Sequence, residues 1–203
     1  MDLILVRHPP PDVASNVCYG RTDLPVDVSR FDASVSSMQT RLVALLNGRT
    51  PVAIHSSPLQ RARRAADVLA ASFGLRVTQD TRLAEMDFGA WEMRSWDAID
   101  RHDLEAWAND VSGFSPPGGE SARDIAVRVD AWARGLRTDP PDGHAEKNAV
   151  HVAVAHAGPI RLHTATALRL PTTACLSWTL DFGGICHLRI ADDGQARLIR
   201  WNG

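Results

Sequence analysis

Two histidines, two arginines and a glutamate stand near the ends of predicted strands, where side chains can meet a ligand. The first pair is Arg7 and His8, where the apolar run 3–6 stops before three prolines. Pro9 restrains His8, because the residue before a proline is kept out of the α region. A guanidinium binds phosphate oxygens bidentately, and a histidine can form a covalent intermediate as a nucleophile. This pair therefore predicts chemistry on a phosphate group.

A further arginine, Arg61, follows Ser57-Pro58 in the sequence. Serine is a good N-cap and proline suits the first helical position, so we expect a helix to start at Pro58, with Arg61 in its first turn. Arg63 and Arg64 are typical of the solvated face of such a helix. We therefore predict that Arg61 is the residue of this cluster that holds phosphate.

The remaining candidates are His156 and Glu85. His156 follows the strand-like run 149–155, and as a cation beside bound phosphate it would stabilise the transferring oxygens. Glu85, in the irregular loop 82–91, is a candidate general acid for the departing alcohol. Nearby arginines favour an ionised carboxylate, so we expect Glu85 to carry a proton only beside a phosphate dianion. A metal shared by His151 and His156 is disfavoured, because five residues apart on one strand they point to opposite faces.

These candidates converge if the strands before them are parallel neighbours, because ligands bind beyond the carboxyl ends of such strands. Strands alternate with helices along the chain, and an Asp-Gly pair near its end is a hairpin signal. We expect an α/β fold, a three-layer α/β/α sandwich with a mixed, mostly parallel sheet, in a single domain over 1–203. The expected strands are 3–6, 51–55, 75–78, 149–155, 175–181, 185–191 and 196–201, the expected helices are 31–46, 58–73, 96–107, 121–136 and 160–170, and 138–148 is an expected loop.

Length and composition limit the function classes. The chain has 203 residues, a formal net charge of −2 and a hydrophobic share of 44%, so no positive field favours nucleic acid or an anionic membrane. Its 3 cysteines form no CxxC pair, which argues against a disulfide framework and for a reducing cytoplasm. The first apolar run is too short for a signal peptide or a membrane span. We expect a cytoplasmic protein with neither a nucleic-acid nor a membrane partner.

Four motifs, in order along the chain, resemble those of the histidine phosphatase superfamily, also called phosphoglycerate mutase-like proteins. LVRH resembles the RHG motif of that family, which implies that Arg7 binds phosphate and that His8 is transiently phosphorylated. SSPLQRARRAA is similar to the second motif of the family, which implies that Arg61 grips phosphate.

The other two motifs extend the resemblance to the acid and to the second histidine. LAEMDFGAWE is similar to the acid-bearing motif, which implies that Glu85 is the proton donor. HAG matches the second-histidine motif and implies that His156 and Ala157 contact the substrate. CYGRTDLP, FGAWE and PPGGES look most like the small-phosphatase branch, which includes α-ribazole-5′-phosphate phosphatases of late cobalamin assembly.

The same comparison indicates which residues line the entrance and where the chain departs from its family. Tyr19, Gly20 and Arg21 of CYGRTDLP are predicted to line the entrance and bind substrate. Pro9 replaces the usual glycine of RHG, and Met93 stands where these phosphatases often have glycine. These departures bear on the substrate more than on the chemistry.

The predicted activity is that of a metal-independent phosphomonoesterase of the histidine acid phosphatase type, without a cofactor. Its predicted partner is a small-molecule phosphate ester, for which α-ribazole 5′-phosphate is one candidate. Two alternatives stay open: a cofactor-dependent phosphoglycerate mutase, whose phosphohistidine returns its group to another hydroxyl, and a non-catalytic phosphate-binding protein. The sequence also leaves open whether the chain forms a homodimer.

Overall fold

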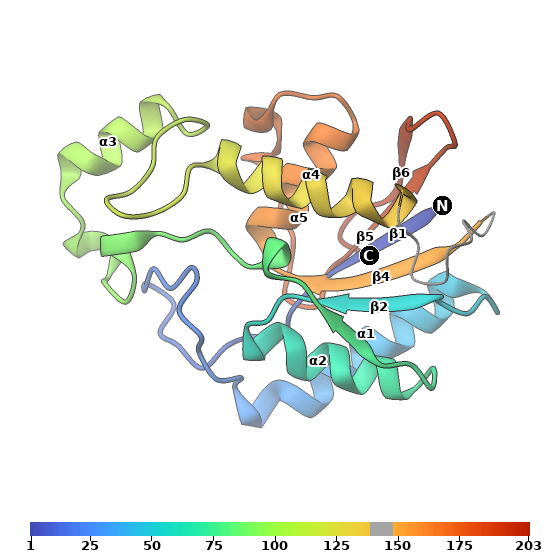
Figure 1. Cartoon of the computed structure of the whole chain (residues 1–203). Coiled ribbons are helices and arrows are strands. Elements are labelled where there is room, and N and C mark those ends of the chain that lie inside the picture. Colours follow the sequence, from blue (N-terminus) through green and yellow to red (C-terminus); the bar gives the residue numbers. More distant parts are fainter. Residues whose placement is uncertain (139–147) are drawn as a thin grey trace.

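Within residues 1–138 and 148–203, which the computed structural model describes, six strands form one mixed sheet in the order β3-β2-β4-β1-β5-β6 (Figure 1). β3, β2, β4 and β1 run parallel, and β5 pairs antiparallel with both β1 and β6. The hairpin predicted at Asp193-Gly194 joins the last two strands. The strands are β1 (Asp2–Arg7), β2 (Ala53–Ser56), β3 (Val77–Gln79), β4 (Val150–Ala155), β5 (Ile185–Ile190) and β6 (Ala196–Arg200).

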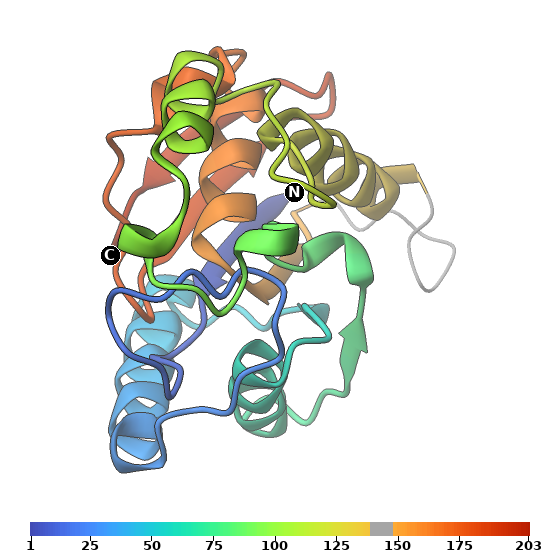
Figure 2. The same ribbon diagram turned by 90° about the vertical axis from the view of Figure 1, so that its left-hand side faces the viewer.

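Helices cover both faces of the sheet, which confirms the predicted three-layer α/β/α sandwich. α1 and α2 lie on one face, and α4 and α5 lie on the other (Figures 1 and 2). α3 lies beyond the edge of the sheet (Figure 1). The helices are α1 (Val28–Leu46), α2 (Gln60–Ala71), α3 (Arg101–Asn109), α4 (Ala122–Thr138) and α5 (Ala157–Ala167).

The central strand β1 contributes to both cores, because successive strand residues point to opposite faces of a sheet. Leu3 and Leu5 pack in the core beneath α4 and α5, whereas Ile4 and Val6 pack in the core beneath α1 and α2. All four side chains are fully buried, and burying each one stabilises the fold by about 2 kcal/mol. The end of β1, which carries the predicted nucleophile, is therefore held on a rigid support.

The helix predicted over 96–107 is wrong in its first half. The chain makes a short 3₁₀ turn, η3 (Trp96–Ala98), and α3 begins only at Arg101. The carboxylate of Asp100 accepts a hydrogen bond from the His102 N–H at 2.8 Å. Asp100 is therefore the N-cap of α3, a role that aspartate favours, so the helix starts after it.

The strand predicted over 175–181 does not form. The 3₁₀ turn η4 (Thr172–Cys175) is followed by an irregular segment that reaches β5. In this segment the Leu180 carbonyl accepts a hydrogen bond from Arg7 Nη1 at 2.5 Å, and the Asp181 N–H donates to Asn202 Oδ1 at 2.8 Å. Backbone groups that a strand would use for pairing are bonded to side chains here.

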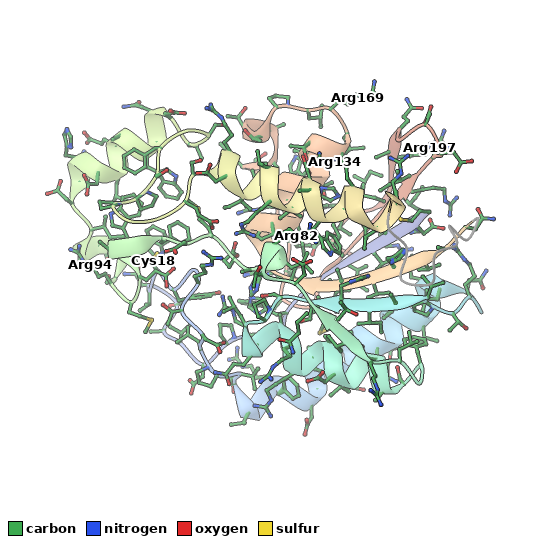
Figure 3. All side chains as sticks on the ribbon, in the orientation of Figure 1. Cys18, Arg82, Arg94, Arg134, Arg169 and Arg197 are labelled. Carbon is green, nitrogen blue, oxygen red and sulfur yellow. The ribbon has the colours of Figure 1, made fainter. Side chains whose placement is uncertain are left out.

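Segments 10–25 and 84–121 extend beyond the carboxyl ends of the parallel strands (Figure 1). The second of these segments contains α3. The two segments have a small core of their own, with Cys18, at the left of Figure 3, among its buried residues. We call segment 84–121, with the small core that it forms around Cys18, the aromatic extension. The members of this core are Cys18, Trp91 and Ile99, with partly buried Phe88, Trp96, Leu104, Trp107 and Phe114 packed against them.

Most of the loop predicted over 138–148 lies outside the described residues. The irregular loop predicted over 82–91 contains two 3₁₀ turns, η1 (Thr81–Leu83) and η2 (Gly89–Trp91). In the described part of the chain, no helix is both long enough and apolar enough to span a bilayer.

Asp2, at the start of β1, ties three parts of the chain together. Its buried carboxylate lies 2.6 Å from His187 Nε2 and accepts hydrogen bonds from Arg49 at 2.7 Å and Arg189 at 3.0 Å. Burial raises the pKa of Asp2, but the hydrogen bonds from His187, Arg49 and Arg189 outweigh it and lower the pKa to about 2.

We expect Asp2→Asn to lower the free energy of unfolding by roughly 2 kcal/mol at neutral pH. Because the folded-state pKa lies below the unfolded one, the carboxylate stabilises the fold above about pH 4 and loses this effect as the pH falls toward about 2. Urea unfolding should therefore show the gap between wild type and variant shrinking below about pH 4. Exposed Asp32→Asn is the control, and a gap that does not change with pH would contradict the prediction.

Candidate active site

His8 lies just after β1, at the carboxyl edge of the parallel strands, and it is buried. Its Nδ1 lies 2.6 Å from the Pro9 carbonyl oxygen. A carbonyl only accepts hydrogen bonds, so Nδ1 carries the hydrogen and Nε2 keeps a free lone pair. Burial, followed by the charges of Arg61 and Arg7, lowers the pKa of His8 well below its usual value, although the Pro9 bond opposes this. The ring is a neutral base with Nε2 available.

Arg7 is held by the irregular segment that precedes β5. Its Nη1 donates to the Leu180 carbonyl, and its guanidinium carbon lies 3.8 Å from the centroid of the Phe182 ring. The same ring lies 5.5 Å from the His8 ring. Phe182 is therefore a neighbour of both groups, and no pattern in its sequence context signals this.

Arg61 is buried in the first turn of α2, as predicted. It donates from Nη1 to the Thr22 carbonyl at 2.7 Å and from Nη2 to the Gly20 carbonyl at 2.6 Å, while its buried Nε has no partner in the described residues. Its guanidinium carbon lies 5.2 Å from the centroid of the Tyr19 ring. The loop 19–22 therefore positions this arginine.

The predicted start of α2 is wrong by two residues. The helix begins at Gln60, and Asp23 Oδ1 accepts its N–H at 2.7 Å. Ser57 is not the N-cap, because that position is occupied by Leu59. The Ser57 hydroxyl lies 2.8 Å from His156 Nε2 and also accepts the Leu59 N–H at 3.2 Å. Ser57 instead links the start of this helix segment to the second histidine.

His156 immediately precedes α5, next to the end of β4, and its ring centroid lies 4.8 Å from that of His8. Its Nε2 contacts Ser57, and its buried Nδ1 has no partner in the described residues. Burial, followed by the charges of His8 and Arg61, lowers the pKa of His156 well below its usual value. Nδ1 is therefore a free polar atom next to the nucleophile candidate.

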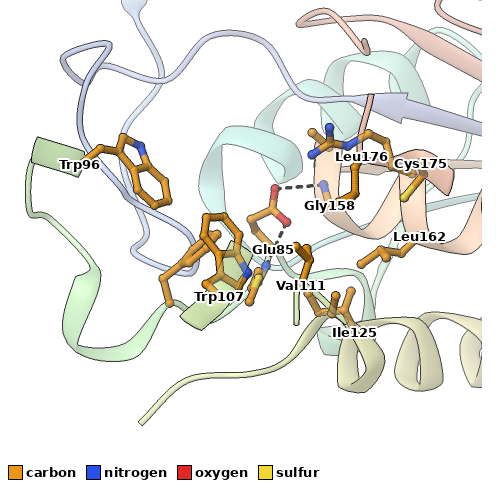
Figure 4. Close-up of a pocket in the computed structure, with 14 residues that line it drawn as sticks. Glu85, Trp96, Trp107, Val111, Ile125, Gly158, Leu162, Cys175 and Leu176 are labelled. Carbon is orange, nitrogen blue, oxygen red and sulfur yellow. Dashed lines mark hydrogen bonds between the residues drawn. The ribbon is translucent and has the colours of Figure 1, made fainter. Parts of the chain in front are cut away.

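Glu85 reaches the same place from the loop after β3. Its Oε1 accepts the Met86 N–H at 2.9 Å, and its Oε2 accepts the Gly158 N–H at 3.3 Å (Figure 4). A Cβ at position 158 would lie 2.3 Å from Oε1 and would displace the carboxylate. Arg128 of α4 supports the loop by donating to the Glu85 carbonyl at 3.0 Å.

The remaining predicted residues are Tyr19, Arg21 and Ala157, with Gly20 described below. Tyr19 faces Arg61, and burial raises the pKa of its phenol while the charge of Arg7 opposes the rise. Ala157 lines a cavity beside Glu85. The Arg21 guanidinium lies 3.6 Å from Asp87 and is partly exposed, so this side chain pairs with the aromatic extension.

Glu92 connects the loop 19–22 to the aromatic extension, a role that the sequence did not indicate. Its carboxylate accepts the N–H groups of Arg21 and Thr22, each at 2.7 Å, the Thr22 hydroxyl, and the Phe88 N–H at 3.1 Å. Because the Gly20 and Thr22 carbonyls hold Arg61, Glu92 indirectly positions that guanidinium. The one feature of the sequence that could have pointed to Glu92 was its place in the FGAWE motif.

Gly20 sits at the most crowded point of this loop. Its φ is +33°, and a Cβ there would lie 2.4 Å from the Met86 carbonyl oxygen and 2.5 Å from Glu92 Oε1. Glycine alone has no Cβ and accepts this backbone conformation without strain.

Together these residues make a positively charged cluster around the His8 imidazole. Arg7 and Arg61 flank His8, His156 contacts it, and Glu85 lies at the edge with two backbone donors on its oxygens. Such an arrangement suits a phosphoryl group, whose oxygens take guanidinium hydrogen bonds while the imidazole meets phosphorus. The fold and this cluster are those of a phosphate-handling α/β protein.

Comparison with known proteins identifies the family. The model of the histidine phosphatase superfamily (branch 1) matches residues 3–203. Glucosyl-3-phosphoglycerate phosphatase of Mycobacterium tuberculosis is 34% identical over 181 residues, covering 83% of this chain and 76% of the relative. The chain therefore belongs to the histidine phosphatase superfamily, and these relatives support phosphatase activity.

Solved structures agree with this assignment. A mycobacterial glucosyl-3-phosphoglycerate phosphatase superposes with a TM-score of 0.84 and 28% identity, covering 100% of this chain and 98% of that one. The α-ribazole phosphatase of Shigella flexneri gives a TM-score of 0.84 and 25% identity, covering 100% and 96%. The resemblance that the four motifs carry is therefore confirmed over the whole chain.

We expect Gly20→Ala to weaken the binding of inorganic phosphate by about 10-fold or more, because the loop that holds Arg61 must move. Calorimetric titration with phosphate measures this. Gly48→Ala is the matched control, since Gly48 also has a positive φ, +82°, but a Cβ there meets nothing within 4 Å. An equal loss of affinity in both variants would show that crowding in the loop is not the cause.

Proposed function

We propose that this chain is a phosphomonoesterase that works through a phosphohistidine at His8. The observation that carries the proposal is the buried His8 ring, whose Nδ1 lies 2.6 Å from the Pro9 carbonyl oxygen and whose pKa is lowered by burial and by the charges of Arg61 and Arg7. A lone pair fixed beside two guanidinium groups is suited to attack a phosphoryl group that those arginines hold.

In the first step, Nε2 of His8 attacks phosphorus and a P–N bond forms as the P–O bond to the alcohol breaks. The electron pair of the broken bond stays on the alcohol oxygen, which takes the proton of the Glu85 carboxyl. Arg7 and Arg61 hold the transferring oxygens. The unpartnered Nδ1 of His156 is available to one of them, and a bound phosphate dianion favours the cationic form of this ring.

In the second step, water attacks the phosphohistidine, and the ionised Glu85 carboxylate takes its proton. The P–N bond breaks, its electron pair returns to Nε2, and inorganic phosphate leaves. Glu85 is then protonated again and His8 is neutral. The two arginines and His156 supply the positive charge, so we propose that the reaction needs neither a metal nor a cofactor.

The substrate is a small phosphate ester, and the protein works in the cytoplasm. The names of relatives give two phosphate esters to assay, glucosyl-3-phosphoglycerate and α-ribazole 5′-phosphate. Tyr19, Gly20, Arg21 and Ala157 are the residues that we propose as contacts for the rest of the substrate.

We expect His8→Ala to reduce the hydrolysis of 4-nitrophenyl phosphate by about 1,000-fold or more, because the nucleophile is removed. Reaction with labelled ester and an alkaline quench should leave phosphate on His8 of the wild type, found by mass spectrometry. Hydrolysis should persist in the presence of a chelator. His102→Ala, on the exposed side of α3, is the control and should behave as the wild type.

Three results would contradict this proposal. Undiminished hydrolysis by His8→Ala, or label on another residue, would exclude His8 as the nucleophile. Isomerisation of 3-phosphoglycerate that depends on a bisphosphorylated primer would indicate a mutase. Phosphate binding by the wild type without any hydrolysis would indicate a binding protein.

A further inference from the structure

A cavity of about 260 Å³ opens beside Glu85 (Figure 4). It is bounded by the aromatic extension, by the start of α4, by α5 and by η4. Glu85 and Ala157, both predicted site residues, are in its wall, so the cavity adjoins the side of the site that holds the predicted acid. Its lining residues are Glu85, Met86, Phe88, Trp96, Trp107, Val111, Ala122, Ile125, Ala157, Gly158, Arg161, Leu162, Cys175 and Leu176.

The wall on the extension side is aromatic. Trp96 and Trp107 stack with their ring centroids 5.9 Å apart and their planes at 7°. Phe88 meets Trp96 edge-on at 5.7 Å and Trp107 at 6.1 Å. These rings hold one another in place, so the wall is a fixed apolar surface, of the kind that packs well against another ring.

Besides Glu85, this wall contains Arg161, the indole N–H groups of Trp96 and Trp107, and the Cys175 thiol, which donates to the Thr172 carbonyl. Arg161 makes one hydrogen bond among the described residues, a long one of 3.4 Å from Nη1 to the Trp178 carbonyl. The Trp107 indole N–H is buried and has no partner in the described residues. Glu85 itself is occupied by the backbone N–H groups of Met86 and Gly158. The cavity therefore offers a cation and a buried donor within an otherwise apolar surface.

We propose that this cavity binds the alcohol part of the substrate, and that this alcohol combines an aromatic ring with an anionic group bound by Arg161. The inference rests on the proposed function, in which Glu85 protonates the departing alcohol and must therefore face it. A cavity of about 150 Å³ holds a benzene molecule, so this one has room for a ring and a substituent. The anionic substituent meets the guanidinium of Arg161, and the Trp107 N–H meets an acceptor.

A sugar-like alcohol suits this cavity poorly. Each of its hydroxyl groups would need a hydrogen-bond partner once it leaves water, and the walls are mainly Phe, Trp, Val, Ile, Leu and Met side chains. The chemistry of the walls therefore favours the binding of an aromatic, acidic alcohol over that of a polyol.

The test uses three esters, each of which releases its alcohol as an alkoxide. Differences in leaving-group chemistry between them therefore stay small. They are 3-carboxybenzyl phosphate, benzyl phosphate and glycerol 1-phosphate. We expect the wild-type kcat/KM to fall in that order, by about 10-fold at each step. In Arg161→Gln, the ratio of kcat/KM for the carboxybenzyl ester to that for the benzyl ester should fall about 10-fold. The ratio corrects for any general loss of active protein.

Arg63→Gln is the matched control, because Arg63 is an exposed arginine on α2, and its ratio should equal that of the wild type. Equal or faster turnover of glycerol 1-phosphate would overturn the aromatic part of the inference. An unchanged ratio in Arg161→Gln would overturn the assignment of the anion to that residue. In both cases 4-nitrophenyl phosphate is still hydrolysed, whereas loss of all hydrolysis in the wild type would mark the failure of the proposed function and of this inference with it.

Discussion

The candidate site depends on one hydrogen bond, from Nδ1–H of His8 to the carbonyl of the next residue, Pro9. This bond fixes both the tautomer and the direction of the ring, because the hydrogen on Nδ1 leaves the lone pair on Nε2. It also satisfies a polar atom in a fully buried position, where an unpaired donor is costly. The constraint is local in sequence, but its effect on the site depends on groups that come from far along the chain.

Parallel pairing of β1, β4 and β2 brings those distant groups together. The strands end side by side, so His8, His156 and the Ser57–Arg61 segment leave the sheet at one edge. Burial and the nearby cations keep the imidazole of His8 neutral there. A charged ring at this point would repel the guanidinium groups and would have no lone pair to offer. The neutral state of His8, its position and the positive charge around it thus follow from the same packing.

Much of this could be predicted from sequence, since strand ends, prolines and helix starts are local signals. The parts that could not be predicted depend on long-range contacts. Ser57 has the local pattern of an N-cap, yet its hydroxyl contacts His156, which is distant in sequence. Segment 175–181 has the composition of a strand, yet its Leu180 carbonyl binds Arg7. Met93 stands where the family often has glycine, and it adopts a positive φ of +62°. The family pattern therefore indicated a position of left-handed backbone, which this chain occupies with a methionine.

The central claim is that the free protein presents His8 as a neutral ring with a bare Nε2. Nitrogen-15 NMR of the histidine rings, with His8 assigned through a His8→Gln variant, measures the protonation of both ring nitrogens directly. We expect hydrogen on Nδ1 and none on Nε2 from about pH 7.5 to about pH 5.5, because the pKa of His8 lies well below the ordinary value. Protonation of both nitrogens with a midpoint near the ordinary histidine value of about 6.5, or hydrogen on Nε2 alone, would contradict the account.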